Sequence, residues 1–183
     1  EANVWQVHED ALERKRAGDD IVLLSVGDPD LSTPDYIADY TVAQIRLGRT
    51  HYSPAAGEPE LRRCLAELEN SISPRAFTAE QFAIFSGATA ALYATFSCLL
   101  DPGDEVVIPE PMYAAYRGLF APIGAKIVGV PLLSTHDGNE FVLDPEAVIA
   151  AIGPATRAVL VNTPGNPCGN IIPSKTLETL AAY

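Results

Sequence analysis

The second half of the chain alternates short apolar runs with amphipathic stretches of helical period, and the links between them are brief. The apolar runs predict strands, and the stretches with apolar residues three to four apart predict helices. The predicted strands are residues 81–85, 105–108, 126–130 and 157–161. The predicted helices are residues 90–100, 112–123, 144–152 and a last one that opens at Pro173 or Ser174. Strands alternating with helices in this way predict an α/β fold with a mostly parallel sheet flanked by helices.

The first half of the chain predicts mainly helices. Helical spacing covers residues 4–17, 35–47 and 59–69, and the second of these helices lies between Pro34 and Gly48, a favourable start and end. The apolar residues 21–26 predict one short buried strand, which ends at the turn formed by Gly27, Asp28 and Pro29.

Composition narrows the possible partners. The net charge is −12, with 24 acidic and 12 basic residues, which disfavours nucleic acid and anionic membrane surfaces because both require clustered Lys and Arg. No apolar run approaches the roughly 20 residues that span a bilayer. Cys64, Cys98 and Cys168 are scattered, odd in number and without metal-ligand spacing. This pattern predicts a reducing, cytoplasmic location and no metal site.

Ligands of open parallel α/β sheets bind beyond the carboxyl ends of the strands, and three such ends carry candidate chemistry. The first is Ser86-Gly87-Ala88-Thr89, where small residues expose backbone N–H groups at a helix start, which suits an anion such as phosphate. Taken alone, however, small residues at a strand-to-helix turn more often reflect tight packing.

The other two strand ends carry an aromatic ring and an amide. Pro109-Glu110-Pro111-Met112-Tyr113 fixes a loop from which Tyr113 could stack on a heteroaromatic ring, although a tyrosine in the core is an open alternative. The segment 162–169 (NTPGNPCG) holds two Asn and two Pro in eight residues, more than a simple turn needs. The Asn166 amide can donate to an oxygen anion, and Pro167 restricts the backbone before it.

Taken together and in order, these segments resemble the aminotransferase class I family along the whole chain. Asn166-Pro167-Cys168-Gly169 is similar to that family's Asn-Pro-Thr-Gly motif, with Cys168 in place of Thr. Further matching segments are Val26-Gly27-Asp28-Pro29-Asp30, Thr33-Pro34, Tyr52-Ser53-Pro54, Gly57, Leu61-Arg62, Asp101-Pro102-Gly103-Asp104 and Pro111-Met112-Tyr113. Within the family, the segments 23–29, 50–52 and 110–113 and the early helix containing Trp5 resemble arginine–pyruvate aminotransferases.

The resemblance implies an enzyme of the pyridoxal-phosphate (PLP) transferase fold type I, in which PLP carries the reaction. The backbone of Gly87, Ala88 and Thr89 would hold the cofactor phosphate, and Tyr113 would stack on its ring. Asn166 would contact the ring's phenolate oxygen and help to place the substrate carboxylate.

The resemblance also implies that Gly27 would bring its backbone close to that carboxylate. Tyr52 would reach the phosphate of a neighbouring subunit in a homodimer with shared sites. Residues 1–48 would belong to the small domain and interdomain region, and residues 49–183 to the N-terminal part of the large PLP-binding domain.

The resemblance places the family's PLP-binding lysine after residue 183, so no catalytic residue is assigned within this chain, and the chain alone is expected to be inactive. The complete protein would transfer an amino group from an amino acid, possibly arginine, to a 2-oxo acid such as pyruvate. Lys175 is interpreted as a solvated residue at a helix end. A PLP-dependent lyase, a PLP-sensing regulator and a dinucleotide-binding domain remain alternatives. The last lacks a Gly-x-Gly-x-x-Gly turn.

Overall fold

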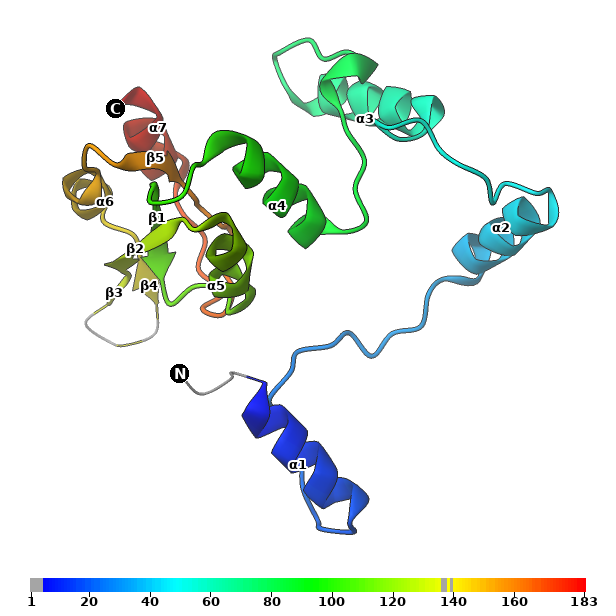
Figure 1. Ribbon diagram of the computed structural model, residues 1–183, viewed down its shortest axis with the longest axis horizontal. Coiled ribbons are helices and arrows are strands. Elements are labelled where there is room, and N and C mark those ends of the chain that lie inside the picture. The colour runs from blue at the N-terminus through cyan, green and yellow to red at the C-terminus, as the bar shows by residue number, and fades with distance from the viewer. Residues whose placement is uncertain (1–4, 136–137, 139) are drawn as a thin grey trace. The chain divides into compact units, whose positions relative to one another are not determined.

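The computed structural model describes residues 5–135, 138 and 140–183. The chain divides into two compact units, unit 1 comprising Glu1–Leu61 and unit 2 comprising Arg62–Tyr183 (Figure 1). The sheet and both groups of buried side chains belong to unit 2. Among the described residues, no helix combines the length and the apolar character that crossing a membrane requires.

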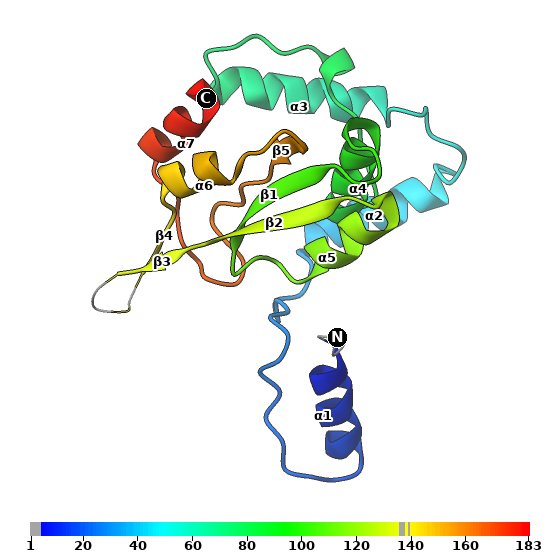
Figure 2. The ribbon, with the colours of Figure 1, turned by 60° about the vertical axis from the view of Figure 1, so that its left-hand side comes forward.

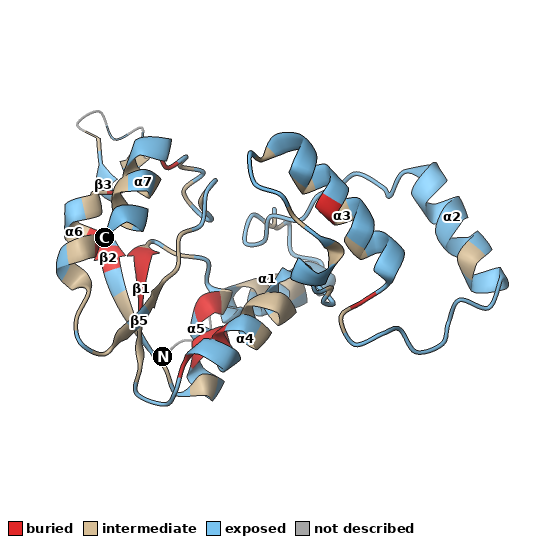
Figure 3. Ribbon diagram, turned by 90° about the horizontal axis from the view of Figure 1, so that it is seen from above, coloured by how far each residue is buried: buried red, intermediate tan, exposed pale blue. Residues whose placement is uncertain are grey.

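Unit 1 consists of two helices and the start of a third, joined by irregular segments. They are α1 (Gln6–Arg16), α2 (Asp35–Arg46) and the first residues of α3 (Pro59–Ile72). Neither α1 nor α2 contains a buried residue (Figure 3). Pro34 precedes α2, and Gly48 follows it in the left-handed conformation at φ 77°. The three helices predicted for this part of the sequence are therefore confirmed.

The predicted strand at residues 21–26 is wrong. These residues form no strand, and side chains expected in the core are exposed, Val22 by 78% and Leu24 by 89%. A strand is stable only with a partner for its backbone ladder and an apolar surface to cover one face. No strand among the described residues pairs with this segment.

The predicted strand at residues 81–85 is also wrong, and here local hydrogen bonds explain the result. The structure has a single 3-10 turn, η1 (Ala79–Gln81), in which the Thr78 N–H donates to the Gln81 side chain at 2.8 Å. The Arg62 guanidinium donates to the carbonyls of Ala79 and Phe82 at 3.0 and 2.9 Å. A side chain thus occupies backbone acceptors that a neighbouring strand would use.

The remaining predicted strands are confirmed and form one parallel sheet. They are β1 (Glu105–Glu110), β2 (Lys126–Pro131) and β5 (Thr156–Val159), arranged in the order β2-β1-β5 (Figures 1 and 2). The central strand β1 is buried over residues 106–109. A near-continuous apolar run of this kind is expected where helices cover both faces of a parallel strand.

Alternate residues of β1 do face different helices. Val106 and Ile108 pack with side chains of α4 (Ala88–Leu99) and α5 (Ala115–Phe120), including Phe96 and Phe120, whose rings lie 4.8 Å apart. Val107 belongs to a second cluster with Val148 of α6 (Pro145–Ala151), and Leu177 and Leu180 of α7 (Ser174–Ala182) pack against this cluster. The period of two along β1 therefore gives three layers, with helices on both sides of the sheet.

Two shorter features complete unit 2. The 3-10 turn η2 (Ala121–Ile123) continues α5, and the strands β3 (Leu133–Ser134) and β4 (Phe141–Val142) form an antiparallel pair that the sequence did not predict. The predicted cap of α6 is present, since the Glu146 N–H donates to the Asp144 carboxylate at 3.0 Å. Lys175 is exposed in the first turn of α7, as expected.

Gly129 of β2 provides a test of how tightly the ends of the sheet are packed. A Cβ atom added at Gly129 would collide with the Glu110 carboxylate, which pairs with Arg117 at 3.1 Å. We expect Gly129→Ala to displace the carboxylate, the far end of a flexible and partly exposed side chain, and to lower the free energy of unfolding by less than about 1 kcal/mol. Chemical denaturation of the protein measures this change.

Two controls accompany that measurement. In a Glu110→Ala background, Gly129→Ala should cost clearly less, because the colliding side chain is gone. Gly118→Ala in α5, where nothing lies within 4 Å of the added atom, should be neutral or slightly stabilising. An equal cost of Gly129→Ala in both backgrounds would contradict this account of the contact.

Candidate functional site

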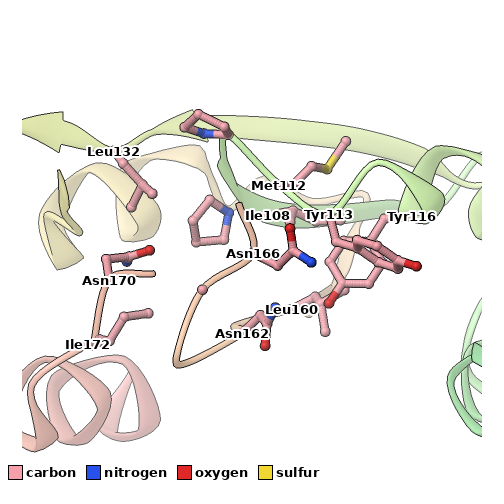
Figure 4. Close-up of a pocket in the computed structure, with 13 residues that line it drawn as sticks. Ile108, Met112, Tyr113, Tyr116, Leu132, Leu160, Asn162, Asn166, Asn170 and Ile172 are labelled. Atoms are coloured by element: carbon pink, nitrogen blue, oxygen red, sulfur yellow. The ribbon is translucent and has the colours of Figure 1, made fainter. Parts of the chain in front are cut away.

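The carboxyl ends of β1 and β5 lie side by side at a reversal of the strand order. The chain leaves β1 through α5 on one face to reach β2, and it returns through α6 on the other face to β5. Such a reversal leaves a crevice above the strand ends, where α/β proteins bind ligands. A cavity lies here, lined by residues of both loops and of the strand ends (Figure 4). Its polar side chains and aromatic rings belong to Tyr113, Tyr116, Asn162, Asn166 and Asn170.

Two tyrosines form one wall of this cavity. The rings of Tyr113 and Tyr116 meet edge to face, with centroids 5.5 Å apart and an interplanar angle of 86°. Tyr116 is 7% exposed, and burial, together with the neighbouring Tyr113, raises the pKa of its phenol, so the neutral form persists well above physiological pH. Tyr113 is 37% exposed. Tyr116 therefore supports the pair from the core, and Tyr113 offers a ring face to a ligand.

The opposite wall is the loop that follows β5, and backbone bonds hold it in shape. The Gly165 N–H donates to the Asn170 carbonyl at 2.8 Å, and the Gly169 N–H donates to the Gly165 carbonyl at 2.7 Å. The Ile172 N–H donates to the Thr163 hydroxyl at 2.9 Å. Asn166 lies inside this closed loop, and its side-chain amide is exposed on the side of the tyrosine rings (Figure 4).

The start of α4 adds a site with the character of an anion receptor. Gly87 precedes the helix at φ 96°. The N-terminal end of α4 has no side-chain cap, and its first turn contains no acidic residue. The first backbone N–H groups of a helix lack partners within the helix, and the helix dipole makes this end positive. Ala88 and Thr89 are exposed, so these donors can reach a ligand.

A second cavity connects this helix end to the tyrosines. Ala88, Thr89 and Leu92 of α4 line it together with Tyr113 and Tyr116. Tyr113 thus borders both cavities, with the start of α4 on one side and Asn166 on the other. The structure therefore brings three predicted residues, Ala88, Thr89 and Asn166, around the ring of a fourth, Tyr113, with Gly87 adjoining in sequence.

Gly27 and Tyr52, the other two predicted site residues, belong to unit 1. Both are exposed, Tyr52 completely. The residues that line the two cavities all belong to unit 2. The predicted contacts of Gly27 and Tyr52 with substrate and cofactor therefore rest on the sequence resemblance alone.

Asn170 is the cavity residue that the sequence analysis missed. Its carboxamide oxygen lies against Gly165, in the space that a side chain at position 165 would fill. No local sequence pattern announces this contact, because it depends on how the loop folds back on itself. Asn162 carried a signal, since it stands within the segment 162–169 already identified at a strand end. Tyr116 lies in the predicted helix 112–123, directly after another such segment.

The groups that line these cavities suit a flat ligand that carries an anionic group. A positive helix end and an amide donor line the two cavities that share the exposed ring of Tyr113. Comparison with known proteins agrees with this interpretation. Residues 19–183 match the model of the aminotransferase class I and II family, and the chain belongs to that family, whose class I members depend on PLP.

Two curated relatives show where the chain stands within the family. The chain is 44% identical over 180 residues to an arginine–pyruvate transaminase of Pseudomonas aeruginosa, covering 98% of this chain and 45% of the relative. It is 39% identical over 175 residues to an aspartate/prephenate aminotransferase of Thermus thermophilus, covering 96% of this chain and 45% of the relative. The chain thus spans a little under half the length of the curated relatives that it matches.

Solved structures confirm the fold. An aspartate aminotransferase of Thermus thermophilus with maleate superposes with a TM-score of 0.89 at 37% identity, covering 100% of this chain and 47% of that one. An alanine aminotransferase of Pyrococcus furiosus gives a TM-score of 0.90 at 30% identity, covering 100% and 46%. The predicted fold class, a part of an aminotransferase fold with a parallel sheet flanked by helices, is therefore correct.

Proposed function

We propose that the complete protein is a PLP-dependent aminotransferase, which transfers an amino group from an amino acid to a 2-oxo acid. The observation that carries this proposal is the convergence on Tyr113 of the uncapped start of α4 and the loop of Asn166. These three elements offer a phosphate site, a stacking surface and a polar donor at one end of the sheet. Membership of the aminotransferase family supports the same assignment.

The residues present fit the cofactor chemically. The backbone N–H groups of Ala88 and Thr89 would bind the phosphate, because no acidic side chain in the first turn of α4 opposes an anion there. Gly87 would form the turn into the helix beside the phosphate, since its own N–H donates to the Phe85 carbonyl at 2.9 Å. The exposed ring of Tyr113 would stack on the pyridine, which is worth about 0.5–1.5 kcal/mol beyond the buried area. When bound, the cofactor supplies the electron-withdrawing ring that activates the substrate's α-carbon.

Asn166 would orient both cofactor and substrate. Its amide would donate to the phenolate oxygen of the ring and help to place the substrate carboxylate, as the family resemblance implies. The hydrogen bonds that close its loop would hold the backbone of Asn166 in place before any ligand binds, so that little backbone order is lost on binding. We extend the proposal to Gly27, whose lack of a side chain would let its backbone approach the same carboxylate.

The phosphate site can be tested with a charge at the start of α4. We expect Thr89→Asp in the complete protein to weaken PLP binding roughly tenfold or more, because a carboxylate would stand beside a doubly charged phosphate. Thr89→Asn is the matched control: it has the same shape without the charge and should change the dissociation constant little, since the backbone donors remain. Equilibrium binding followed by cofactor absorbance measures both. Equal affinities for the two variants would place the phosphate elsewhere.

The proposed donor is a basic amino acid, with pyruvate as acceptor. The greater identity to an arginine–pyruvate transaminase than to an aspartate/prephenate aminotransferase, 44% against 39%, favours this choice. We expect the complete enzyme to convert arginine faster than aspartate in a donor screen that follows the cofactor's absorbance change. Rapid turnover of aspartate with arginine inert would reject the arginine assignment and leave the aminotransferase assignment intact.

We also propose that the protein works as a homodimer in the cytoplasm. The fully exposed Tyr52 is available to a second subunit, where its hydroxyl would donate to the partner's cofactor phosphate, a charge-assisted bond of roughly 1.5–3 kcal/mol. The three cysteines are free, which fits a reducing compartment. Cell fractionation of the native protein tests the location, and recovery outside the cytoplasm would reject it.

Mixed dimers test the role of Tyr52. One parent carries Tyr52→Phe, and the other carries alanine at the PLP-binding lysine that the family resemblance places after residue 183. If Tyr52 serves the partner's site, one site of each mixed dimer is intact, so co-refolding should exceed the mean activity of the separate variants. Activity equal to that mean, with mixed dimers present by mass spectrometry, would confine Tyr52 to its own subunit or to no role.

A further inference from the structure

We propose that Asn170 is a positioning residue for Asn166, acting through Gly165, the residue that directly precedes Asn166. This inference rests on the role of Asn166 at the cofactor proposed above. It concerns a side chain that the family motif, residues 166–169, does not include.

Asn170 contacts Gly165 in two ways. Its carbonyl accepts the Gly165 N–H at 2.8 Å, and its carboxamide oxygen occupies the place where a side chain at position 165 would stand. The φ of Gly165 is not in the left-handed region, so the backbone conformation does not demand glycine there. The close approach of Asn170 is the reason that glycine fits this position.

The contact between Asn170 and Gly165 affects Asn166 through the backbone of the loop. The Gly169 N–H bonds the Gly165 carbonyl at 2.7 Å, so Gly165 is held from both of its peptide groups. Asn166 is exposed, and its own side chain has little packing to fix it. Its orientation toward Tyr113 therefore depends on where the backbone of Gly165 lies.

Asn170 also lies close enough to Asn166 to influence its position. It is half-buried and lines the same cavity as Asn162 and Asn166 (Figure 4). Half-burial restricts the carboxamide to few orientations. Its contact with Gly165 is therefore better maintained than that of an exposed side chain would be. Asn162 is the natural comparison, because its backbone carbonyl, and not its side chain, lies near Gly165.

The experiment uses the complete protein and the variants Asn170→Ala, Gly165→Ala and their combination, with Asn166→Ala as reference. Two readouts report on the cofactor: its dissociation constant and the pH midpoint of the absorbance of the bound form. We expect Asn170→Ala to weaken binding about fivefold. The absorbance midpoint should shift in the same direction as in Asn166→Ala, but less. Thermal midpoints monitor folding separately.

The combination of variants gives the sharper test. Gly165→Ala should resemble Asn170→Ala, because the new methyl group displaces the same carboxamide, and the double variant should be no worse than either single one. Asn162→Ala combined with Gly165→Ala should instead be additive. Additivity of Asn170→Ala with Gly165→Ala, or unchanged cofactor readouts in Asn170→Ala, would overturn the inference. If Asn166→Ala also leaves the cofactor unchanged, the proposed role of Asn166 fails first.

Discussion

The pairing of β1 with parallel strands on both sides is the constraint on which the rest of the structure depends. Val106 and Val107 are fully buried and face opposite layers, so β1 organises both halves of the core. Its register with β2 and β5 also sets where the two following loops emerge. Tyr113 and Asn166 are 53 positions apart in the sequence numbering and line one cavity because their strands are neighbours.

The site follows from this frame with few additional requirements. α4 packs on α5 on one face of the sheet, and the second cavity joins its first turn to the ring of Tyr113. Hydrogen bonds within residues 163–172 shape the other wall. The chemistry lies in exposed groups, while buried neighbours such as Tyr116 hold them in place. This division lets a family keep one scaffold and vary the groups that meet the substrate.

Sequence pattern predicted the strands of the sheet from their apolar runs, and two helix ends from residues that neighbour them in the chain. The apolar runs at 105–108, 126–130 and 157–161 became the sheet, and the caps at Gly48 and Asp144 formed as expected because they involve only neighbouring residues. Residues 21–26 and 81–85 have similarly apolar sequences, but none of the described strands pairs with them. An apolar run does not reveal whether a partner strand is available.

The residues of the candidate site also fall into a group that the sequence identified and one residue that it did not. Ordered motifs identified Ala88, Thr89, Tyr113 and Asn166, which the structure brings around two adjoining cavities. Asn170 was not identified from the sequence, because only the folded loop places its carboxamide against Gly165. A contact that depends on how the backbone of a loop curves cannot be predicted from periodicity or motif spacing in the sequence.

The central claim, that the start of α4, Tyr113 and Asn166 together form one PLP site, is tested most directly by a crystal structure of the complete protein with PLP. The account predicts phosphate oxygens roughly 2.7–3.2 Å from the backbone nitrogens of Ala88 and Thr89. It also predicts the pyridine ring against Tyr113, with the Asn166 amide at its phenolate oxygen. A phosphate bound away from the start of α4, or a ring that does not contact Tyr113, would contradict it.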